Sequence, residues 1–599
     1  MPCRTRKKVA IVNVIRQLAD LFDARGERAK LVGLLLLLLV GSGLEILGIG
    51  VFLPFVRLIS EPAAVAQHPR FGPMLRTLGL ENREAIILAA SLALIGLFVV
   101  KNTYLAFQWR VLFKFVYAKM ARTARDIFAG YLERPYTFHL RHNSAELLQN
   151  VTIEVKNTFS VVVRQVLITT TELLVTVGIA GFLIFVSPAA ALAGFAAVGS
   201  LAWLVSRLSS RRLEQLGKRR EVELGRVYRI LQESFGALKE IRVLRRENYF
   251  LRGFERSENL YVNALRDSNL LSQYPRLAIE TIAVLALTGL AGFLLLRGQG
   301  MAEALSTLVV FGVAIIRLVP AAARITAGVN QIRFFAPSVQ TVHDSWLARK
   351  ELMALARKTE PEVTLLLRRE IALDSVSYSY PDGPDPVLRQ LSLSIPRGQS
   401  AGFVGSSGAG KTTLLHLLLG LLQPSSGRIL VDGTDIHANV RAWQRQIGFI
   451  PQDPYLLDDT IRRNVAFGVP DDEIDEEAVW RALDAAQLLA SIDTLDKGLD
   501  TLAGERGVRM SGGQGQRLAI ARALYHDPEV LILDEATSSL DYETEARIVG
   551  ALQEIKGDKT LIIVSHRHQA VRDCDIIHVL EGGRLAASGR FEEILSSRL

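Results

Sequence analysis

The feature that most constrains the fold is a series of long apolar runs that ends near residue 330. A helix needs roughly 20 mostly apolar residues to cross the hydrocarbon core of a bilayer. Six stretches reach this length: about 31–59, 84–109, 158–186, 188–208, 275–296 and 301–327. Glycines and Pro54 interrupt the first stretch, which membrane helices tolerate. The sequence therefore predicts an α-helical transmembrane bundle of six helices.

The distribution of charge predicts how this bundle is oriented. The first 30 residues carry eight Lys and Arg against three Asp and Glu, and the long segments near 110–157 and 207–272 are also rich in Lys and Arg. The loop at 61–83 has only Arg70, Arg76 and Arg83 as cations. By the positive-inside rule, both termini and both long segments are expected in the cytoplasm. Cytoplasmic loops then account for the formal net charge of +9 without a nucleic-acid partner. We expect a multi-pass protein of the cytoplasmic (inner) membrane.

The N-terminal 30 residues are expected to form a cytoplasmic elbow. The start MPCRTRKK is basic, but the next long apolar run begins only near Leu31, which does not fit a cleaved signal peptide. Within residues 9–22, one helical face carries Ile11, Val14, Ile15, Leu18 and Phe22. This pattern suits an amphipathic helix on the membrane surface, although an ordinary helix packed in a protein core would show the same pattern.

The sequence pattern changes after the predicted helical bundle. Residues 337–365 are expected to be a polar linker, and short apolar runs then alternate with helical patterns. Such alternation is typical of an α/β domain with a largely parallel sheet. The expected organisation is an elbow at 1–30, a six-helix domain at 31–336, a linker at 337–365 and an α/β domain at 366–599.

The first sequence motif of the α/β domain is one that binds phosphate. The sequence GSSGAGKT fits G-x-x-x-x-G-K-[ST], and it follows a strand pattern and precedes a helical one, as the motif requires. Backbone N–H groups of such a loop surround phosphates at a helix N-terminus. Lys411 is expected at the β- and γ-phosphates of a nucleotide. The residues expected to hold the nucleotide here are Gly405, Ser406, Ser407, Gly408, Ala409, Gly410, Lys411, Thr412 and Thr413.

A second motif narrows the choice among kinases, GTPases and other ATPases. The apolar strand pattern EVLIL ends in two carboxylates, Asp534 and Glu535. Asp534 and the Thr412 hydroxyl are expected to ligate Mg²⁺, and Glu535 is expected to polarise the attacking water.

A third motif carries a family resemblance. Ser511, Gly512, Gly513 and Gln514, followed by a helical run, resemble the signature of ATP-binding-cassette (ABC) proteins, with Met510 where the family usually has Leu. The resemblance implies an α/β P-loop ABC ATPase domain and a membrane half of the type I ABC exporter fold. It also implies that Tyr380 stacks on adenine, that Gln452 senses Mg²⁺ and the transport domain, and that His566 lies near the γ-phosphate. The stretches at 504–507 and 538–541 resemble the cross-contacting loop and the D-loop.

The resemblance also implies a partner. In the family, the signature turn contacts the γ-phosphate bound by the other subunit, so Lys411 and Ser511 of one chain would serve opposite sites. Because all the expected residues are present, a homodimer with two hydrolysing sites is expected, and pairing with a paralogue is the alternative.

Short stretches of the membrane half suggest the cargo. The stretches PYTFHLRHNSAELLQNVTIEV, KNTYL and RLVPAAARI are similar to flippases of lipid-linked oligosaccharides, while EIRVLRRENYFLRGFE is similar to a cytoplasmic coupling region of exporters. Cations inside membrane helices normally face a cavity or a partner. Lys101, Arg276 and Arg317 are therefore candidates for binding a diphosphate head group. The alternatives are that Arg276 only extends to the interface and that Lys101 pairs with a carboxylate such as Glu280.

Other functions fit the sequence less well. A soluble cassette ATPase acting on nucleic acid or ribosomes would not need six spans, and an ATP-gated channel would need regulatory segments that the sequence does not show. Export of other lipids, drugs or peptides remains open beside the lipid-linked oligosaccharide.

Overall fold

The structure is a computed structural model that describes residues 11–23, 25–51, 55, 83–186, 188–296, 301–358, 365–381, 383, 385–504, 507, 510–535, 557–566 and 571–596. The chain divides into two compact units. The first comprises Met1–Arg134 and His139–Arg357, and the second comprises Pro135–Phe138 and Lys358–Leu599.

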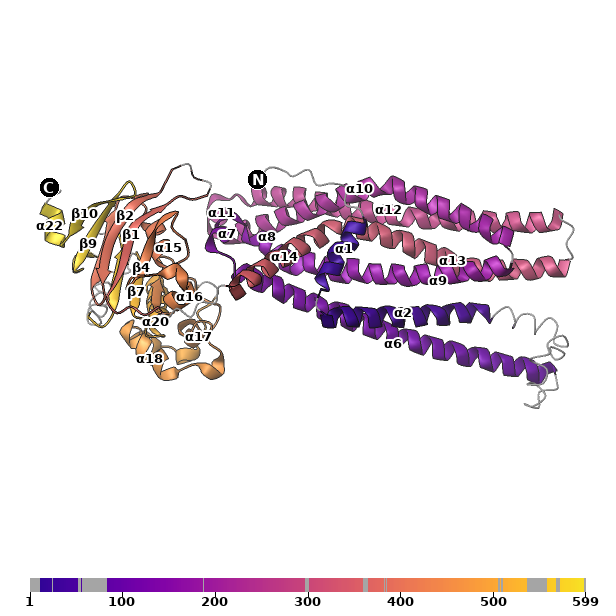
Figure 1. Ribbon diagram of the computed structural model, residues 1–599, viewed down its shortest axis with the longest axis horizontal. Coiled ribbons are helices and arrows are strands. Elements are labelled where there is room, and N and C mark those ends of the chain that lie inside the picture. The colour runs from indigo at the N-terminus through magenta and orange to yellow at the C-terminus, as the bar shows by residue number, and fades with distance from the viewer. Residues whose placement is uncertain are drawn as a thin grey trace. The chain divides into compact units, whose positions relative to one another are not determined.

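The first unit is built of long helices that run alongside one another (Figure 1). Its helices are α1 (Ile11–Leu21), α2 (Arg25–Gly50), α6 (Arg83–Leu132), α8 (Ser144–Gln149), the π-helical turns η1 (Asn150–Glu154) and η2 (Asn157–Val163), α9 (Arg164–Val186), α10 (Pro188–Gly236), α11 (Leu238–Leu244), α12 (Glu247–Leu296), α13 (Met301–Phe334) and α14 (Ala336–Lys358). Helix α7 (Tyr136–Arg141) begins in the second unit and ends in the first.

The structure has helices at all six predicted spans. By length and composition, four helical segments of the described residues could cross a membrane: Gly26–Gly48, Glu84–Leu132, Ser144–Ile184 and Glu247–Phe293. The other two predicted spans, 188–208 and 301–327, lie in α10 and α13, many of whose side chains fall outside the described part. Pro275 and Pro320 lie inside helices, where neighbouring helices and local adjustments can satisfy the freed carbonyls.

Helix α6 shows why these helices are stable although much of their surface is exposed. Leu88, Leu92, Ile95 and Val99 are at least 60% exposed, and their spacing of three and four residues places them on one face. A stripe of this kind would be a liability in water but is suited to lipid. At 50 residues, α6 is also much longer than a single span requires, so it continues beyond the bilayer.

The structure adds detail to two expectations at the borders of this unit. Val14 and Leu18 of α1 are buried, and the ring of Phe22 stacks on Phe115 with centroids 5.6 Å apart. Part of the apolar face of α1 therefore packs on protein, while Ile15 on the same predicted face is 48% exposed. The segment expected to be a linker from residue 337 begins instead as helix α14, whose Val339 and Val342 are buried.

The second unit contains two sheets (Figure 1). The first sheet is antiparallel and has the order β2-β1-β4-β5, with strands β1 (Glu370–Tyr378), β2 (Leu388–Pro396), β4 (Ser426–Val431) and β5 (Thr434–Asp435). The second has the order β10-β9-β3-β8-β7-β6, with strands β3 (Ser400–Gly405), β6 (Ile447–Ile450), β7 (Val530–Asp534), β8 (Thr560–Val564), β9 (Ile576–Glu581) and β10 (Arg584–Gly589). All neighbouring pairs of this sheet are parallel except β9 and β10.

Helices cover these sheets and form two main cores. Helix α15 (Lys411–Leu418) packs with both sheets, and its buried leucines share one core with Trp443 of α16 (Val440–Gln444). A second core joins β6 and β7 to the helical segment of the unit. The helices of that segment are α17 (Ile461–Val465), α18 (Glu476–Ala485), α19 (Leu489–Ile492) and α20 (Gly512–Leu524), and α22 (Phe591–Ser596) lies near the C-terminus. Strands β3, β7 and β8 run parallel and adjacent, so residues at their carboxyl ends meet at one edge.

Candidate ATP site

The phosphate-binding loop lies between β3 and α15. Strand β3 is buried between β8 and β9 and ends at Gly405, and α15 begins at Lys411. Gly408 and Gly410 have φ angles of 81° and 99°, in the left-handed region that favours glycine. A Cβ atom on Gly410 would also lie only 2.7 Å from Leu388 Cδ2. The loop therefore needs glycine at these positions to turn back toward the start of α15, where backbone N–H groups can bind an anion.

The side chain of Lys411 lies across this loop. Its Nζ donates to Gly405 O at 2.8 Å and to Ser406 O at 3.1 Å, and the residue is 9% exposed. These carbonyl contacts hold the ammonium at the loop, where phosphate oxygens could take their place. Thr412, the next residue, is exposed, while Thr413 is buried.

Two predicted residues from distant parts of the chain, Gln452 and His566, meet at Glu535. Gln452 Nε2 donates to Glu535 Oε2 at 2.9 Å, and His566 Nδ1 lies 2.9 Å from Glu535 Oε1. Glu535 has a φ angle of 47°, which is unusual for a residue other than glycine, and its N–H donates to Val564 O at 2.9 Å. The backbone at the end of β7 is thus held in a strained conformation that presents the carboxylate to both partners.

The oxygen donors at the sheet edge suit Mg²⁺. Burial and the neighbouring Glu535 raise the pKa of Asp534, and Lys411 partly offsets this. A bound cation would favour the ionised carboxylate. Among the described residues, no group of three or more His, Cys, Asp or Glu could hold a metal by itself. The donors expected from the sequence, Asp534, Thr412 and Gln452, are a carboxylate, a hydroxyl and an amide, and Mg²⁺ bound by so few protein groups takes its other ligands from phosphates and water.

Tyr380 lies next to the loop. Its hydroxyl and Thr413 Oγ1 are 3.2 Å apart, and its ring makes an edge contact with Tyr378 at a centroid distance of 5.0 Å. Tyr380 is partly buried and packs against the core that α15 shares with the two sheets. The hydroxyl contact was not foreseen from the sequence, which assigned a role only to the ring face.

The signature residues form a separate turn at the start of α20. Ser511 caps the helix: Gln514 N donates to Ser511 Oγ at 3.2 Å, and Ser511 N donates to Gln514 Oε1 at 2.9 Å. The Ser511 hydroxyl accepts in this arrangement, so its proton remains available to an anion. The contacts that Ser511 and Gln514 make here lie within their own turn. The loops at 505–506 and 538–541 lie outside the described residues.

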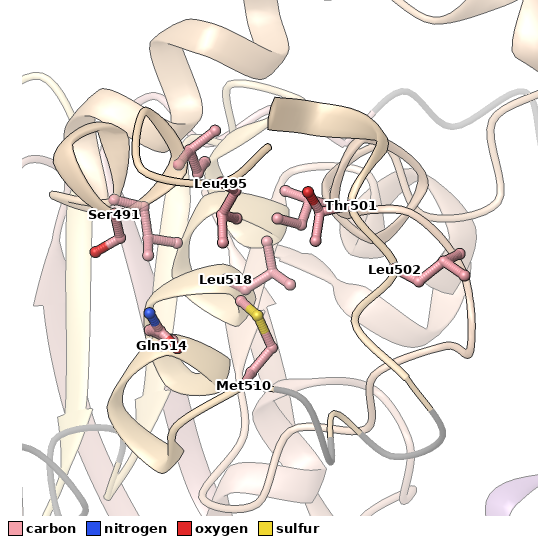
Figure 2. A pocket seen from close by; sticks show the side chains of 10 residues that line it. Ser491, Leu495, Thr501, Leu502, Met510, Gln514 and Leu518 are labelled. Atoms are coloured by element: carbon pink, nitrogen blue, oxygen red, sulfur yellow. The ribbon is translucent and has the colours of Figure 1, made fainter. Parts of the chain in front are cut away.

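A small apolar cavity lies behind this turn (Figure 2). Its volume is about 110 Å³, and Gln514, Met510 and Leu518 line it together with residues of the preceding helices. Figure 2 shows Met510 and Leu518 pointing toward one another beside Gln514. Met510 fills space here where the family usually has Leu, a change that conserves volume.

Arg522 of α20 is a residue of this unit that the sequence analysis missed. It donates to Tyr455 O at 2.9 Å, to Asn464 O at 2.9 Å and to Asn464 Oδ1 at 3.0 Å. Its guanidinium also lies 4.5 Å from the centroid of the Phe467 ring. Arg522 therefore ties the signature helix to the segment that follows Gln452. No motif marks it, because its partners are mostly backbone atoms.

Three cations of the first unit are predicted to bind the cargo, and the structure describes the surroundings of two of them. Arg276 Nε donates to Glu280 Oε1 at 2.9 Å, so Glu280 pairs with Arg276 and not with Lys101. Lys101 Nζ lies 4.2 Å from the centroid of the Phe98 ring. The side chain of Arg317 lies outside the described part. The structure adds Arg324, which makes two hydrogen bonds to Glu172 of α9, at 2.7 and 3.1 Å.

The fold and the site define a class of protein. One unit is a bundle of helices long and apolar enough for a membrane, and the other is a P-loop ATPase domain with a carboxylate, a glutamine and a histidine gathered at one sheet edge. This combination defines an ATP-driven transport protein of the membrane.

Comparison with known proteins identifies the family. The family described as ABC transporter transmembrane region matches residues 34–316, and the family described as ABC transporter matches residues 388–538. The ATP-dependent lipid A-core flippase of Cupriavidus metallidurans is 30% identical over 78% of each chain, and that of Chromohalobacter salexigens is 30% identical over 79% of this chain and 80% of its own. A bacterial Atm1-family ABC exporter, solved with ATP bound, is 25% identical, has a TM-score of 0.75 and covers 96% of this chain and 97% of its own. The chain belongs to the ABC transporter family.

Proposed function

We propose that this ABC transporter flips a lipid-linked substrate across the inner membrane and that the substrate is a polyprenyl-diphosphate-linked oligosaccharide. The observation that carries the lipid-type cargo is the alignment of both domains with proteins named lipid A-core flippases. The finer assignment rests on the short stretches similar to oligosaccharide-lipid flippases. A lipid A-core unit is the second candidate, because the relatives are named for it.

The geometry around Glu535 supports a role as general base. With ATP bound, the carboxylate would accept the proton of the attacking water, while His566 and Gln452 hold it in place. Lys411 would exchange its contacts with Gly405 and Ser406 for the β- and γ-phosphates. Mg²⁺, when bound at Thr412, Gln452 and Asp534, would neutralise charge on the phosphates. Tyr380 would stack on adenine and keep its hydroxyl contact with Thr413.

A second copy of the chain would complete each site. In this proposal, the Ser511 hydroxyl donates to the γ-phosphate held by the partner while its oxygen continues to cap α20. Ser511, Gly512, Gly513 and Gln514 then close the site across the dimer. Both termini and the ATPase domains are placed in the cytoplasm, in line with the charge distribution.

In this proposal, two cytoplasmic segments transmit the movements of the ATPase domain to the membrane helices. Tyr136, counted with the ATPase unit, packs edge-on against His416 with ring centroids 5.3 Å apart. His416 belongs to α15, the helix that Lys411 begins. On α11, Leu238, Val243 and Leu244 are 51%, 82% and 66% exposed, which leaves an apolar surface for a further partner.

The cargo assignment has a direct test in proteoliposomes. Flipping would be measured with three cargoes: a polyprenyl-diphosphate oligosaccharide, a lipid A-core and an ordinary phospholipid. ATP-dependent flipping of the first alone is expected. Flipping of lipid A-core alone would transfer the assignment to the second candidate, and flipping of the phospholipid at the same rate would contradict a specific glycolipid cargo.

The cations give a second, residue-level test. Replacing Lys101, Arg276 and Arg317 with Gln should lower flipping and leave basal ATPase largely intact, since the cassettes are untouched. Arg256→Gln, on α12 outside the predicted spans, is the matched control. Full flipping by the triple variant would show that these cations do not bind the head group.

A further inference from the structure

A buried ion pair crosses between helices of the first unit. Arg220 Nη2 of α10 lies 2.9 Å from Glu154 Oε2 of η1 and also donates to Ser338 Oγ of α14 at 2.8 Å. Arg220 is 1% exposed, and Glu154 and Ser338 are fully buried. The pair therefore joins three helical elements that are far apart in the sequence.

Further contacts extend this pair into a network. Gln149 Nε2 of α8 donates to Glu154 Oε1 at 2.9 Å and to Glu221 O of α10 at 3.3 Å. Thr341 of α14 donates to Glu221 Oε1 at 2.6 Å. Helix α10 is thus fastened on one side to α8 and η1 and on the other to α14.

The backbone approach at this point is unusually close. A Cβ atom on Gly217, almost one helical turn before Arg220, would lie 2.1 Å from Phe334 O at the end of α13. One at Gly225 would lie 3.0 Å from Gln149 Oε1. Gly217, Arg220, Glu221 and Gly225 share one face of α10, so this face is shaped to fit its neighbours.

The winding of the chain changes at the same place. Glu154 ends the π-helical turn η1, and a second π-helical turn, η2, follows at Asn157. Such turns are rare and occur frequently at functional sites. In the predicted topology, residues 110–157 and 207–272 are cytoplasmic, so the pair lies outside the bilayer.

The burial of the pair argues against a purely stabilising role. Removing two charges from water is costly, and well-packed apolar residues are often at least as stable as a buried pair. Among the described residues, Arg220 Nε has no hydrogen-bond partner, so the guanidinium is not fully satisfied. What a buried pair provides is a discrete arrangement: it is either formed or broken, and a partly separated pair is unfavourable.

We propose that the Arg220–Glu154 pair is a conformational clamp that holds α10 to η1 and α14 and must break when a transport cycle separates them. Transport needs at least two arrangements of the helices, and the clamp sets the balance between them. Arg220 and Glu154 are positioning residues here, since they touch neither nucleotide nor cargo. The inference depends on the chain being an ATP-driven transporter and not on which cargo it carries.

The test uses a variant that removes the charges but keeps the volume. The full-length Glu154→Leu/Arg220→Met protein would be placed in nanodiscs, in a background with Cys3 and Cys574 replaced by Ser. Spin labels at Ser144→Cys and Gln232→Cys would report the distance between α8 and α10, because these two exposed side chains lie 2.6 Å apart. Distances would be measured without nucleotide and with ATP trapped.

The clamp predicts that the short-distance fraction falls by at least half in one or both conditions, and that basal ATPase changes at least threefold. Glu214→Leu/Lys218→Met removes a more exposed pair on the same helix and should behave as wild type. Should the apolar variant fail to fold, Glu154→Gln/Arg220→Gln takes its place with the same expectations. Unchanged distances and ATPase in a folded variant would overturn the clamp and leave the pair a structural contact.

Discussion

At the scale of single residues, the ATP site depends on a strained backbone as much as on its side chains. Glu535 adopts a φ angle of 47°, and its carboxylate is contacted by Gln452 and His566. Residues held in such conformations are maintained by their surroundings, here β7 and the backbone contact with Val564. The position of the carboxylate is therefore preorganised, and its chemistry can be tested without disturbing the backbone.

Glu535→Gln should leave ATP binding intact and lower turnover by about 10²–10⁴-fold, the usual contribution of a general base. The amide keeps the shape of the side chain but cannot accept the proton. Phosphate release and binding of a fluorescent nucleotide would be measured on the same preparation. Retention of more than about a tenth of the turnover would contradict the assignment of Glu535 as the base.

His578 of β9 gives a prediction about pH. It is 2% exposed, its Nδ1 lies 2.8 Å from Ser588 Oγ, and burial lowers its pKa to about 4. An unfolded chain would protonate this histidine near pH 6.5, whereas the folded chain stays neutral until about pH 4. The unfolded state then binds more protons in this window, so stability is complete above about pH 6.5 and is lost as pH falls toward 4.

The effect of this one histidine is at most about 3 kcal/mol. His578→Gln should reduce the loss of thermal stability between pH 7 and pH 5, measured on the full chain in detergent. Burial also lowers the pKa of His416 and His437, and these contribute equally in both proteins. His526→Gln, at an exposed position, is the control, and an unaltered pH dependence in His578→Gln would contradict the prediction.

At the scale of elements, α20 links the signature turn to the rest of the ATPase domain. Its N-terminus is capped by Ser511 and Gln514, and Arg522 near its other end fastens it to Tyr455 and Asn464. Burial lowers the pKa of Arg522 to about 10, which still leaves it charged at neutral pH. Among the described residues, the cap hydrogen bonds of α20 lie within its own turn, while Arg522 anchors the other end of the helix to a different segment.

Arg522→Lys should destabilise the ATPase domain by about 1–3 kcal/mol, because an ammonium cannot reproduce the planar set of three bonds or stack equally on Phe467. The measurement is the thermal unfolding of the full chain at fixed pH. Arg481→Lys on α18, whose side chain is 68% exposed, should change little. Equal unfolding temperatures for all three proteins would show that the Arg522 contacts contribute nothing.

The elements also show what the sequence could and could not predict. The loop at Gly405–Thr412 and the carboxylates after β7 follow from local patterns, because their chemistry needs fixed residue types at fixed spacing. Helix α14 was missed because its face packs against the other helices while its composition is polar. The Arg220–Glu154 pair joins residues 66 positions apart in the sequence, and the π-helical turns depend on tertiary packing, so neither leaves a local signal.

At the scale of the whole molecule, the distribution of site residues argues for an assembly. Lys411, Asp534 and Glu535 meet at one sheet edge, whereas the signature residues form their own turn at the start of α20. This separation agrees with the proposal that Ser511 contributes to the ATP site of the partner chain. If two chains share each ATP site, two different inactive variants should restore ATPase activity when they are combined.

Mixing a Lys411→Ala chain with a Ser511→Arg chain should restore ATPase that neither variant shows alone. If Ser511 acts in trans, the heterodimer has one intact site, formed by Lys411 of one chain and Ser511 of the other, and one site broken twice. Heterodimers would be isolated with two different affinity tags, and phosphate release would be expected at up to about half the rate of the wild-type dimer.

The matched control combines Lys411→Ala with Glu535→Gln. Because these two residues belong to the same sheet edge of one chain, each site of that heterodimer has one defect, and no recovery is expected. Recovery in neither heterodimer would contradict a shared site, and recovery in both would contradict the grouping of Lys411 with Glu535.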